Sequence, residues 1–479
     1  MIAYPPRYLA WPALAAILLT GCATPPHVAP PLAQVSGQSL GLGAEAPPIA
    51  GAWWRAYHDP QLDRLIAAGT AGSPTLAAAL ARVRKAQAQL EIERAGLLPR
   101  IRGSGQLNRS RIGDKFLPPP VGGTDANIVI TTIDFGWDLD LFGRQQATVR
   151  QAAALAEAAQ WDAGAARLAL SVSIARAYVQ FAHATQLVRV TDGFVQTRQR
   201  ALGYARSRFN NQLASEFEVR QAETLLAQAG QAQTQAEQQR DTLVHALTAL
   251  VGQAANFYPQ ISEPTLRLDH APDVPDTLPA DLLRRRPDVL AGQARIDAAL
   301  GGTQAARAAF RPDLGISALA GLTAGGLGNV FTGGAFSYSV GPTVSLPIFE
   351  GGRLRGRYKG ATADLDSAIA GYNSAVLDAV RDASDAITNI RSADRALIDQ
   401  MRVVEGLRET ARLNQVRVRT GLGSQIDTID SGFRLLQAEQ QLVDMQADAL
   451  ERRIDLVAAL GGGFDPAAPS DTALGSGPR

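Results

Sequence analysis

The chain has 479 residues, of which 46 are basic and 45 acidic, so its formal net charge is +1. A near-neutral chain of this kind argues against nucleic acid as a partner. It has a single cysteine and 6% aromatic residues, which excludes an internal disulfide and favours long, lightly packed helices over one thick globular core.

The first 21 residues have the features of a secretory signal peptide. Arg7 precedes an apolar run, Leu9–Leu19, which is too short to span a bilayer as a helix. Leu19–Cys22 resembles the lipobox of bacterial lipoproteins, which implies that Cys22 becomes an acylated first residue. Ordinary signal cleavage beside an incidental cysteine is the alternative. Residues 22–59 are then a Pro-rich, lipidated tether.

The rest of the chain contains an internal repeat. Arg208 and Ser215 match Arg417 and Ser424 at an offset of 209 residues, and an offset of 213 relates positions further upstream. We therefore expect a duplication with halves at 60–252 and 287–461, a linker at 253–286 and a tail at 462–479.

Each half is expected to contain two strands between helices. The four predicted strands lie at about 100–110, 128–142, 313–322 and 335–348, and the clearest of them alternate apolar with polar or small residues. One face of each strand is therefore apolar. Four strands cannot close a barrel, and open sheet edges are costly in lipid, so closure requires other copies of the chain. Dimers, trimers and tetramers all remain open at this point.

The helical segments are long and amphipathic. Residues 144–209 and 353–419 lack internal breaks, and a 3,4 spacing of apolar residues from Ile426 to Val457 indicates a coiled-coil seam. At about 1.5 Å per residue, each long helix would measure on the order of 100 Å. That length and their polarity place them in water, packed on one another.

Five ordered motifs carry a resemblance to the outer membrane factor family, the TolC/OprM-like, NodT-type lipoproteins of tripartite RND efflux systems. They are WDLDLFGR (137–144), LLRRRPDV (282–289), LPIFEGGRLRG (346–356), RTGLGSQIDTID (419–430) and AALGGGF (458–464). The resemblance implies a mainly α fold with a membrane β-barrel: a homotrimer whose twelve strands form the barrel in outer-membrane lipid and whose helices form a periplasmic barrel. It also implies a passive exit duct for drugs or other small molecules, served by a periplasmic adaptor and an inner-membrane RND pump.

The resemblance also assigns roles to two sites. It places the two helical turns at a periplasmic tip where the adaptor docks, although a plain helical hairpin explains the same residue types. It makes Asp427 and Asp430, which share one helix face, an acidic ring that closes the periplasmic entrance; two solvated acids in a first turn are the alternative. The tip residues are Arg208, Gln212, Ser215, Arg417, Gly421, Leu422, Gly423 and Ser424.

No enzyme constellation is visible. The sequence has five histidines but no HExxH, and it lacks GxSxG, P-loop and CxxC motifs. We therefore expect neither catalysis nor a metal or cofactor. Two other functions stay open: the duct of a type I protein secretion system, and a structural coiled-coil lipoprotein with no conduit. The sequence does not name a substrate.

Overall fold

A computed structural model describes residues 24–35, 51–111, 113, 115, 120, 123, 125–270 and 285–463. Cys22, the expected signal peptide and most of the expected tail lie outside these residues. The chain divides into two compact units. The sheet unit comprises Met1–Gln34, Arg82–Ala159 and Gly292–Tyr372, and the helical unit comprises Val35–Ala81, Gln160–Ala291 and Asn373–Arg479.

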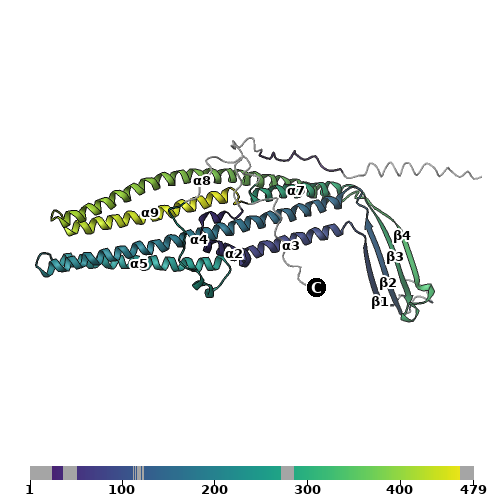
Figure 1. Cartoon of the computed structure of the whole chain (residues 1–479). Helices are drawn as coiled ribbons and strands as arrows, with labels where there is room; N and C mark the ends of the chain where they lie inside the picture. Colours follow the sequence, from purple (N-terminus) through teal and green to yellow (C-terminus); the bar gives the residue numbers. More distant parts are fainter. Residues whose placement is uncertain are drawn as a thin grey trace, which may run out of the picture. The chain divides into compact units, whose positions relative to one another are not determined.

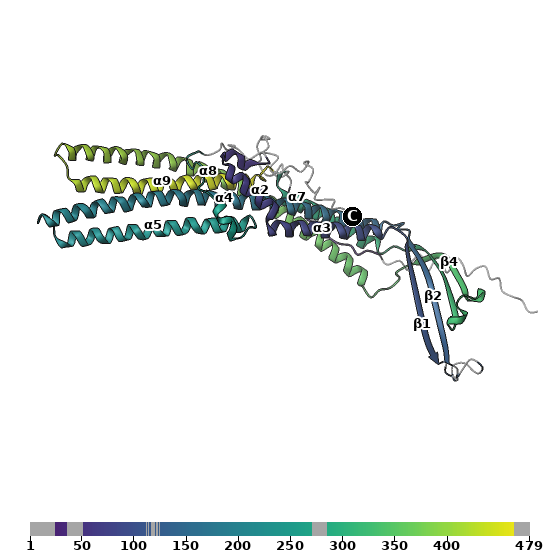
Figure 2. The same cartoon turned by 60° about the horizontal axis from the view of Figure 1, so that its bottom comes forward.

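The sheet unit contains one antiparallel four-stranded sheet in the order β1-β2-β3-β4, labelled in Figure 1 and seen from another side in Figure 2. The strands are β1 (Arg100–Arg111), β2 (Asp125–Asp138), β3 (Asp313–Gly325) and β4 (Phe336–Ser345). Four strands were predicted, but β2 and β4 end three or four residues earlier than the alternation of residues suggested.

The early strand ends have local causes. After β2, Asp140 adopts a left-handed conformation with φ of 45°, and its carboxylate accepts the N–H groups of Gln145 and Gln146 at 2.9 and 2.8 Å. The residue therefore starts the next helix instead of continuing the strand. After β4, Gly351 and Gly352 both have positive φ, which turns the chain into the following helix.

The strand register gives the sheet two chemically different faces. One row of directly opposed residues is apolar on all four strands. A row three positions along β1, which lies on the other face, is polar or small on all four. The apolar row consists of Ile101, Phe135, Ala318 and Val340, and the polar row of Ser104, Thr132, Gly321 and Ser337. The predicted alternation is confirmed, and every strand contributes to both faces.

Helices complete the sheet unit. Residues of α7 (Pro287–Ala308) and α8 (Arg353–Arg419) pack together through Ile296, Leu365 and Ile369, which are almost fully buried. Helices α3 (Pro74–Ala95) and α4 (Arg144–Asn210) also have residues in this unit.

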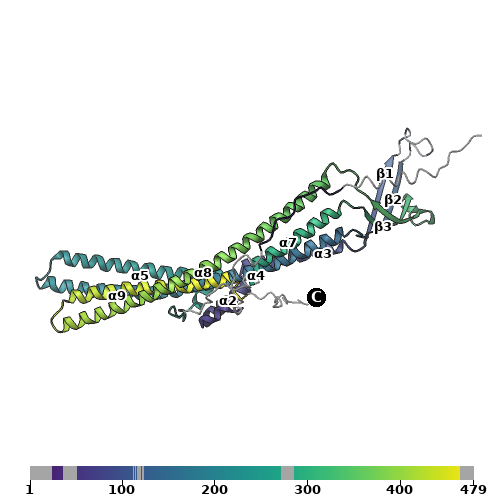
Figure 3. The same ribbon diagram turned by 90° about the horizontal axis from the view of Figure 1, so that it is seen from above.

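The helical unit is built from two helical hairpins. Helix α4 turns back into α5 (Glu216–Leu250), and α8 turns back into α9 (Gln425–Ala459), as Figures 1 and 3 show. Both α4 and α8 have 67 residues, and both α5 and α9 have 35. The order helix, two strands, long helix, turn, helix therefore occurs twice, which confirms the duplication. No helix in the described part of the chain is long and apolar enough to cross a membrane.

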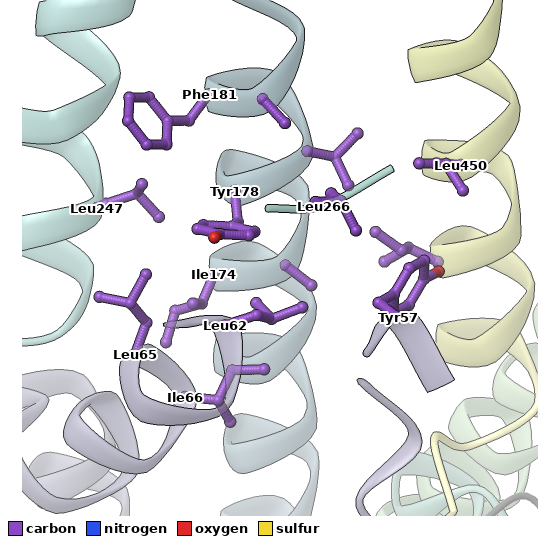
Figure 4. Packing of buried hydrophobic residues seen from close by; sticks show 14 of the residues in the cluster. Tyr57, Leu62, Leu65, Ile66, Ile174, Tyr178, Phe181, Leu247, Leu266 and Leu450 are labelled. Atoms are coloured by element: carbon purple, nitrogen blue, oxygen red, sulfur yellow. The ribbon is translucent and has the colours of Figure 1, made fainter. Parts of the chain in front are cut away.

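A short segment closes the core of the helical unit. Helix α2 (Pro60–Gly72) places Leu62 and Ile66 against Ile174 of α4 and Leu247 of α5, and Tyr178 lies at the centre of the cluster (Figure 4). All of these side chains are almost fully excluded from solvent.

One buried carboxylate joins three segments of this core. Asp59 caps α2 through the N–H groups of Gln61 and Leu62. Its other oxygen accepts the Tyr178 hydroxyl at 2.9 Å and both the backbone N–H and the hydroxyl of Thr265 at 3.0 and 2.9 Å. Burial raises the pKa of Tyr178, and the neighbouring Asp59 charge raises it further. The phenol therefore stays protonated and remains a donor to the carboxylate.

Candidate functional site

The turns between paired helices have the same backbone hydrogen bonds in both halves. In the first, Leu213 N–H donates to the Arg208 carbonyl at 2.8 Å, and Gln212 N–H donates to the Phe209 carbonyl at 2.9 Å. In the second, the Leu422 N–H donates to the Arg417 carbonyl at 2.8 Å, and a hydrogen bond equivalent to that between Gln212 and Phe209 also forms. This pair of bonds is the Schellman motif, which ends a helix by satisfying its last carbonyl groups.

The motif requires one residue in the left-handed region. Gly421 supplies it in the second turn with φ of 72°, as its lack of a side chain allows. In the first turn the residue is Gln212, with φ of 59°. Asparagine tolerates this region better than glutamine, yet neither Asn210 nor Asn211 has a positive φ. The motif fixes which position is left-handed, so Gln212 adopts the conformation although a long L side chain disfavours it.

The two arginines expected at the tips each donate a hydrogen bond within their own turn. Arg208 donates to the Leu213 carbonyl at 2.8 Å, and Arg417 donates to the equivalent Leu422 carbonyl at 3.3 Å. Arg208 also forms an ion pair with Glu218 at 3.0 Å. These arginines therefore stabilise the loops, whatever else they contact.

The second helices of the two hairpins begin differently. The Ser424 hydroxyl accepts the Ile426 N–H at 3.2 Å, and Asp427 accepts the Ser424 N–H at 3.2 Å, which completes a capping box. Ser215 occupies the same position before α5, but its side chain makes no capping hydrogen bond. Only the second tip therefore has a side-chain cap on the helix that follows its turn.

Large apolar side chains are exposed at both turns. Leu213 is 67% and Phe217 72% exposed in the first, and Leu422 is 74% and Ile426 48% exposed in the second. Gly423 lies among them, and a Cβ there would approach the Arg417 Cβ to 3.0 Å. Each turn therefore presents two large apolar side chains to solvent in the single chain.

The two acids predicted at the entrance are both exposed, but they differ in their partners. Asp427 is the capping-box residue, so its carboxylate already accepts a backbone hydrogen bond. Asp430 lies one turn further along α9 and forms an ion pair with Arg434 at 3.1 Å. The two exposed carboxylates therefore differ in their local bonds.

A second basic residue lies near Asp430. The guanidinium of Arg198, on α4, lies 3.8 Å from the centre of the Phe433 ring, an arrangement in which the ring attracts the cation. Burial lowers the pKa of Arg198, and Asp430 partly offsets this effect. The spacing of Arg434 from Asp430 was readable in the sequence, but the approach of Arg198 from a distant helix was not.

Within the described residues, no group of three or more His, Cys, Asp or Glu side chains is arranged to hold a metal ion.

The comparisons with known proteins agree with this architecture. The family model described as "Outer membrane efflux protein" matches residues 65–253 and again 278–462. The chain is 35% identical to the fusaric acid resistance protein FusA of Burkholderia cepacia, covering 73% of this chain and 68% of that one. It is 30% identical to the multidrug resistance outer membrane protein MdtP of Shigella flexneri, covering 94% of this chain and 95% of that one.

Solved structures show the same fold. The outer membrane protein VceC of Vibrio cholerae matches with a TM-score of 0.80 at 28% identity, covering 88% of this chain and all of that one. The open state of the Neisseria gonorrhoeae MtrE outer membrane channel matches with a TM-score of 0.77 at 25% identity, covering 94% of this chain and all of that one.

The chain therefore belongs to the outer membrane efflux protein family. It is an outer-membrane efflux component, and the family consists of channel or transporter components rather than enzymes. The two matched stretches correspond to the two halves of the duplication.

Proposed function

We propose that the chain is the exit duct of a tripartite efflux pump: a passive homotrimeric channel that carries drugs or other small molecules from a periplasmic adaptor and an inner-membrane RND pump to the outside. The observation that carries the proposal is the sheet, which has one apolar face and two unpaired edges. The resistance functions in the names of FusA and MdtP support small molecules as cargo.

Three copies would complete the sheet. In a bilayer, an open edge leaves backbone N–H and C=O groups unpaired at a cost of several kcal/mol each. Among the residues that the structure describes, strands β1 and β4 each pair on one side only, so β4 of one copy would pair with β1 of the next. The apolar row that includes Ile101 and Val340 would then face lipid, and the row that includes Ser104 and Ser337 would face the lumen.

The two turns would dock the adaptor. Their exposed residues Leu213, Phe217, Leu422 and Ile426 give each copy a pair of apolar tips. The tips share one backbone motif, but only the second has a capping box and a glycine at its left-handed position. We therefore propose that an adaptor distinguishes the two, with the first tip the more adaptable.

Asp427 and Asp430 would narrow the entrance. Asp427 directs its charge at the first turn of α9, and Asp430 is held by Arg434. Each copy would therefore contribute one ion-paired and one capping carboxylate. The closed state would depend on these local bonds as well as on repulsion between copies.

The N-terminal segment would hold the proposed lipid anchor against the helices. The Leu32 N–H donates to Asp366 at 3.1 Å, and the Val35 N–H donates to Asn373 at 2.9 Å. Both acceptors are on α8, seven residues apart, which is about 10.5 Å of helix rise, and three residues of extended chain span a similar distance. The segment that follows Cys22 therefore lies along α8 at these two residues. We keep the boundaries proposed from the sequence: 1–21, 22–59, 60–252, 253–286, 287–461 and 462–479.

The test combines mass and phenotype. We expect native mass spectrometry of the purified protein to give three chains per particle, and a monomer or dimer would contradict the proposal. We expect deletion of the gene to sensitise cells to small toxic compounds. Normal resistance combined with loss of a secreted protein would instead indicate a type I secretion duct, and loss of neither would favour a structural lipoprotein.

A further inference from the structure

The sheet unit contains a cavity of about 190 Å³ where the strands meet the helices. Three chain segments line it: the loop from β2 to α4, the end of α7 and the loop from β4 to α8. These segments include parts of two sequence motifs, LFGR and FEGGRLR, which belong neither to the proposed tips nor to the proposed entrance.

Basic residues predominate in this cavity. Its lining contains four arginines and three acidic residues. Each acid already has a partner: Asp140 accepts two backbone N–H groups of α4, Asp313 pairs with Arg144 at 2.7 Å, and Glu350 pairs with Arg353. Asp140 and Asp313 are therefore occupied within the site, and Arg353 balances the charge of Glu350, whose buried Oε2 accepts no hydrogen bond among the described residues.

The other two arginines, Arg311 and Arg357, have no carboxylate within 4.0 Å among the described residues. The Arg311 guanidinium carbon lies 5.3 Å from the centre of the Phe142 ring. That ring also lines the cavity, so an aromatic surface and two unneutralised cations lie together. Guanidinium groups bind carboxylates through paired N–H donors.

Helix stability does not explain the basic residues. Arg144 and Arg353 are the first residues of α4 and α8, and neither helix has an acid in its first turn. A cation at a helix N-terminus is unfavourable for the helix dipole, where an acid would stabilise. The same residue nevertheless occupies this position in both halves of the duplication.

The cavity is on the polar side of the sheet. Its two strand residues, Asp313 and Ser345, are directly opposite each other in the register and belong to the polar face. In the proposed trimer that face lines the lumen. The site would therefore meet molecules passing through the duct.

We propose that this cavity binds small aromatic carboxylates, with the carboxylate on Arg311 and Arg357 and the ring against Phe142. The cavity is smaller than the roughly 300–1,000 Å³ of pockets for drug-sized ligands, which suits a single ring. The inference rests on the proposed duct and names a class of cargo for it: organic anions, held weakly at three equivalent sites, one in each sheet unit.

The test uses benzoate as the probe and the purified full-length protein. Isothermal titration calorimetry measures its binding without requiring conduction, so the result is separate from the test of the duct. We expect Arg311→Gln/Arg357→Gln to weaken benzoate binding about tenfold or more, because charge-assisted hydrogen bonds are lost. Arg311→Lys/Arg357→Lys keeps the charge but loses the paired donors, and should lie between that variant and wild type.

A matched control removes the same charge elsewhere. Arg402→Gln/Arg408→Gln alters two exposed arginines of α8 in the helical unit and should leave benzoate binding unchanged. Benzoate binding that is absent in wild type, equal in the cavity variant, or equally weakened in the control would overturn the proposal. So would an anionic phospholipid that co-purifies with wild type and is lost from the cavity variant, because a headgroup would then occupy the site.

Discussion

Replacing Val340 by arginine probes the apolar face of the sheet at its centre. Val340 is 71% exposed in the single chain, and its row continues through Ala318 and Phe135 to Ile101. An arginine on the lipid face at the middle of a bilayer costs roughly 2–4 kcal/mol, falling to about 0–1 near the interfaces. Val344 lies one residue from the end of β4, so the same substitution there should cost much less.

The cost recurs in every copy of the chain. In a trimer, three arginines would oppose insertion together, and even about 2 kcal/mol per chain is more than a tenfold change in an equilibrium constant. We expect Val340→Arg to reduce the heat-resistant trimer in outer-membrane fractions severely, as measured on gels of unheated samples.

Ser339→Arg is the control, because Ser339 is the neighbouring residue on the polar face, opposite Leu319. It should assemble well and change ion selectivity instead. If the two variants assembled equally well, or if Ser339→Arg were the more defective, the assignment of the faces would be wrong.

Three further predictions concern the anchor, the tip and the core. Cys22→Ser should abolish labelling by radioactive palmitate, and normal labelling would show that the lipid is attached elsewhere. Gln212→Gly should slow amide exchange in the first tip, because it removes the cost of roughly 1–2 kcal/mol that an L side chain incurs in the left-handed conformation. Gly421→Gln should speed exchange in the second tip for the same reason. If neither variant changed the exchange rate, the proposed difference between the tips would be wrong. Asp59→Asn should lower the melting temperature measured by circular dichroism, because the amide NH₂ would face donors such as Tyr178, at about 1–3 kcal/mol for each unsatisfied group; an unchanged melting temperature would mean the core relaxes around it.

The sequence predicted most of the architecture because that architecture is periodic. Alternation along the strands and the repeated offset between the halves are local or regular signals, and both survive in the structure. The strand ends were less accurate because they depend on single residues. Asp140 can continue an alternating pattern in the sequence, but its left-handed conformation and its capping bonds end the strand.

The positions of the two turns were predicted, but the contacts of the acids were not. The i,i+4 spacing of Arg434 from Asp430 is visible in the sequence, whereas the approach of Arg198 from another helix is not. Contacts between distant parts of the chain leave no periodic signal. Asp59 and Thr265 are 206 residues apart, and the cavity arginines Arg311 and Arg357 come together only through the fold.

The most direct test of the duct is the unitary conductance of purified wild-type protein and of Asp427→Asn/Asp430→Asn in planar bilayers. Asparagine keeps an oxygen that can accept the Ser424 N–H, so the variant removes charge while preserving the helix cap. We expect wild type to form ohmic pores without any energy source, and the variant to conduct markedly better and to be blocked less by divalent cations from the periplasmic side. If neither protein conducted, the chain would not be a passive duct; a variant with unchanged conductance and unchanged block would place the constriction elsewhere.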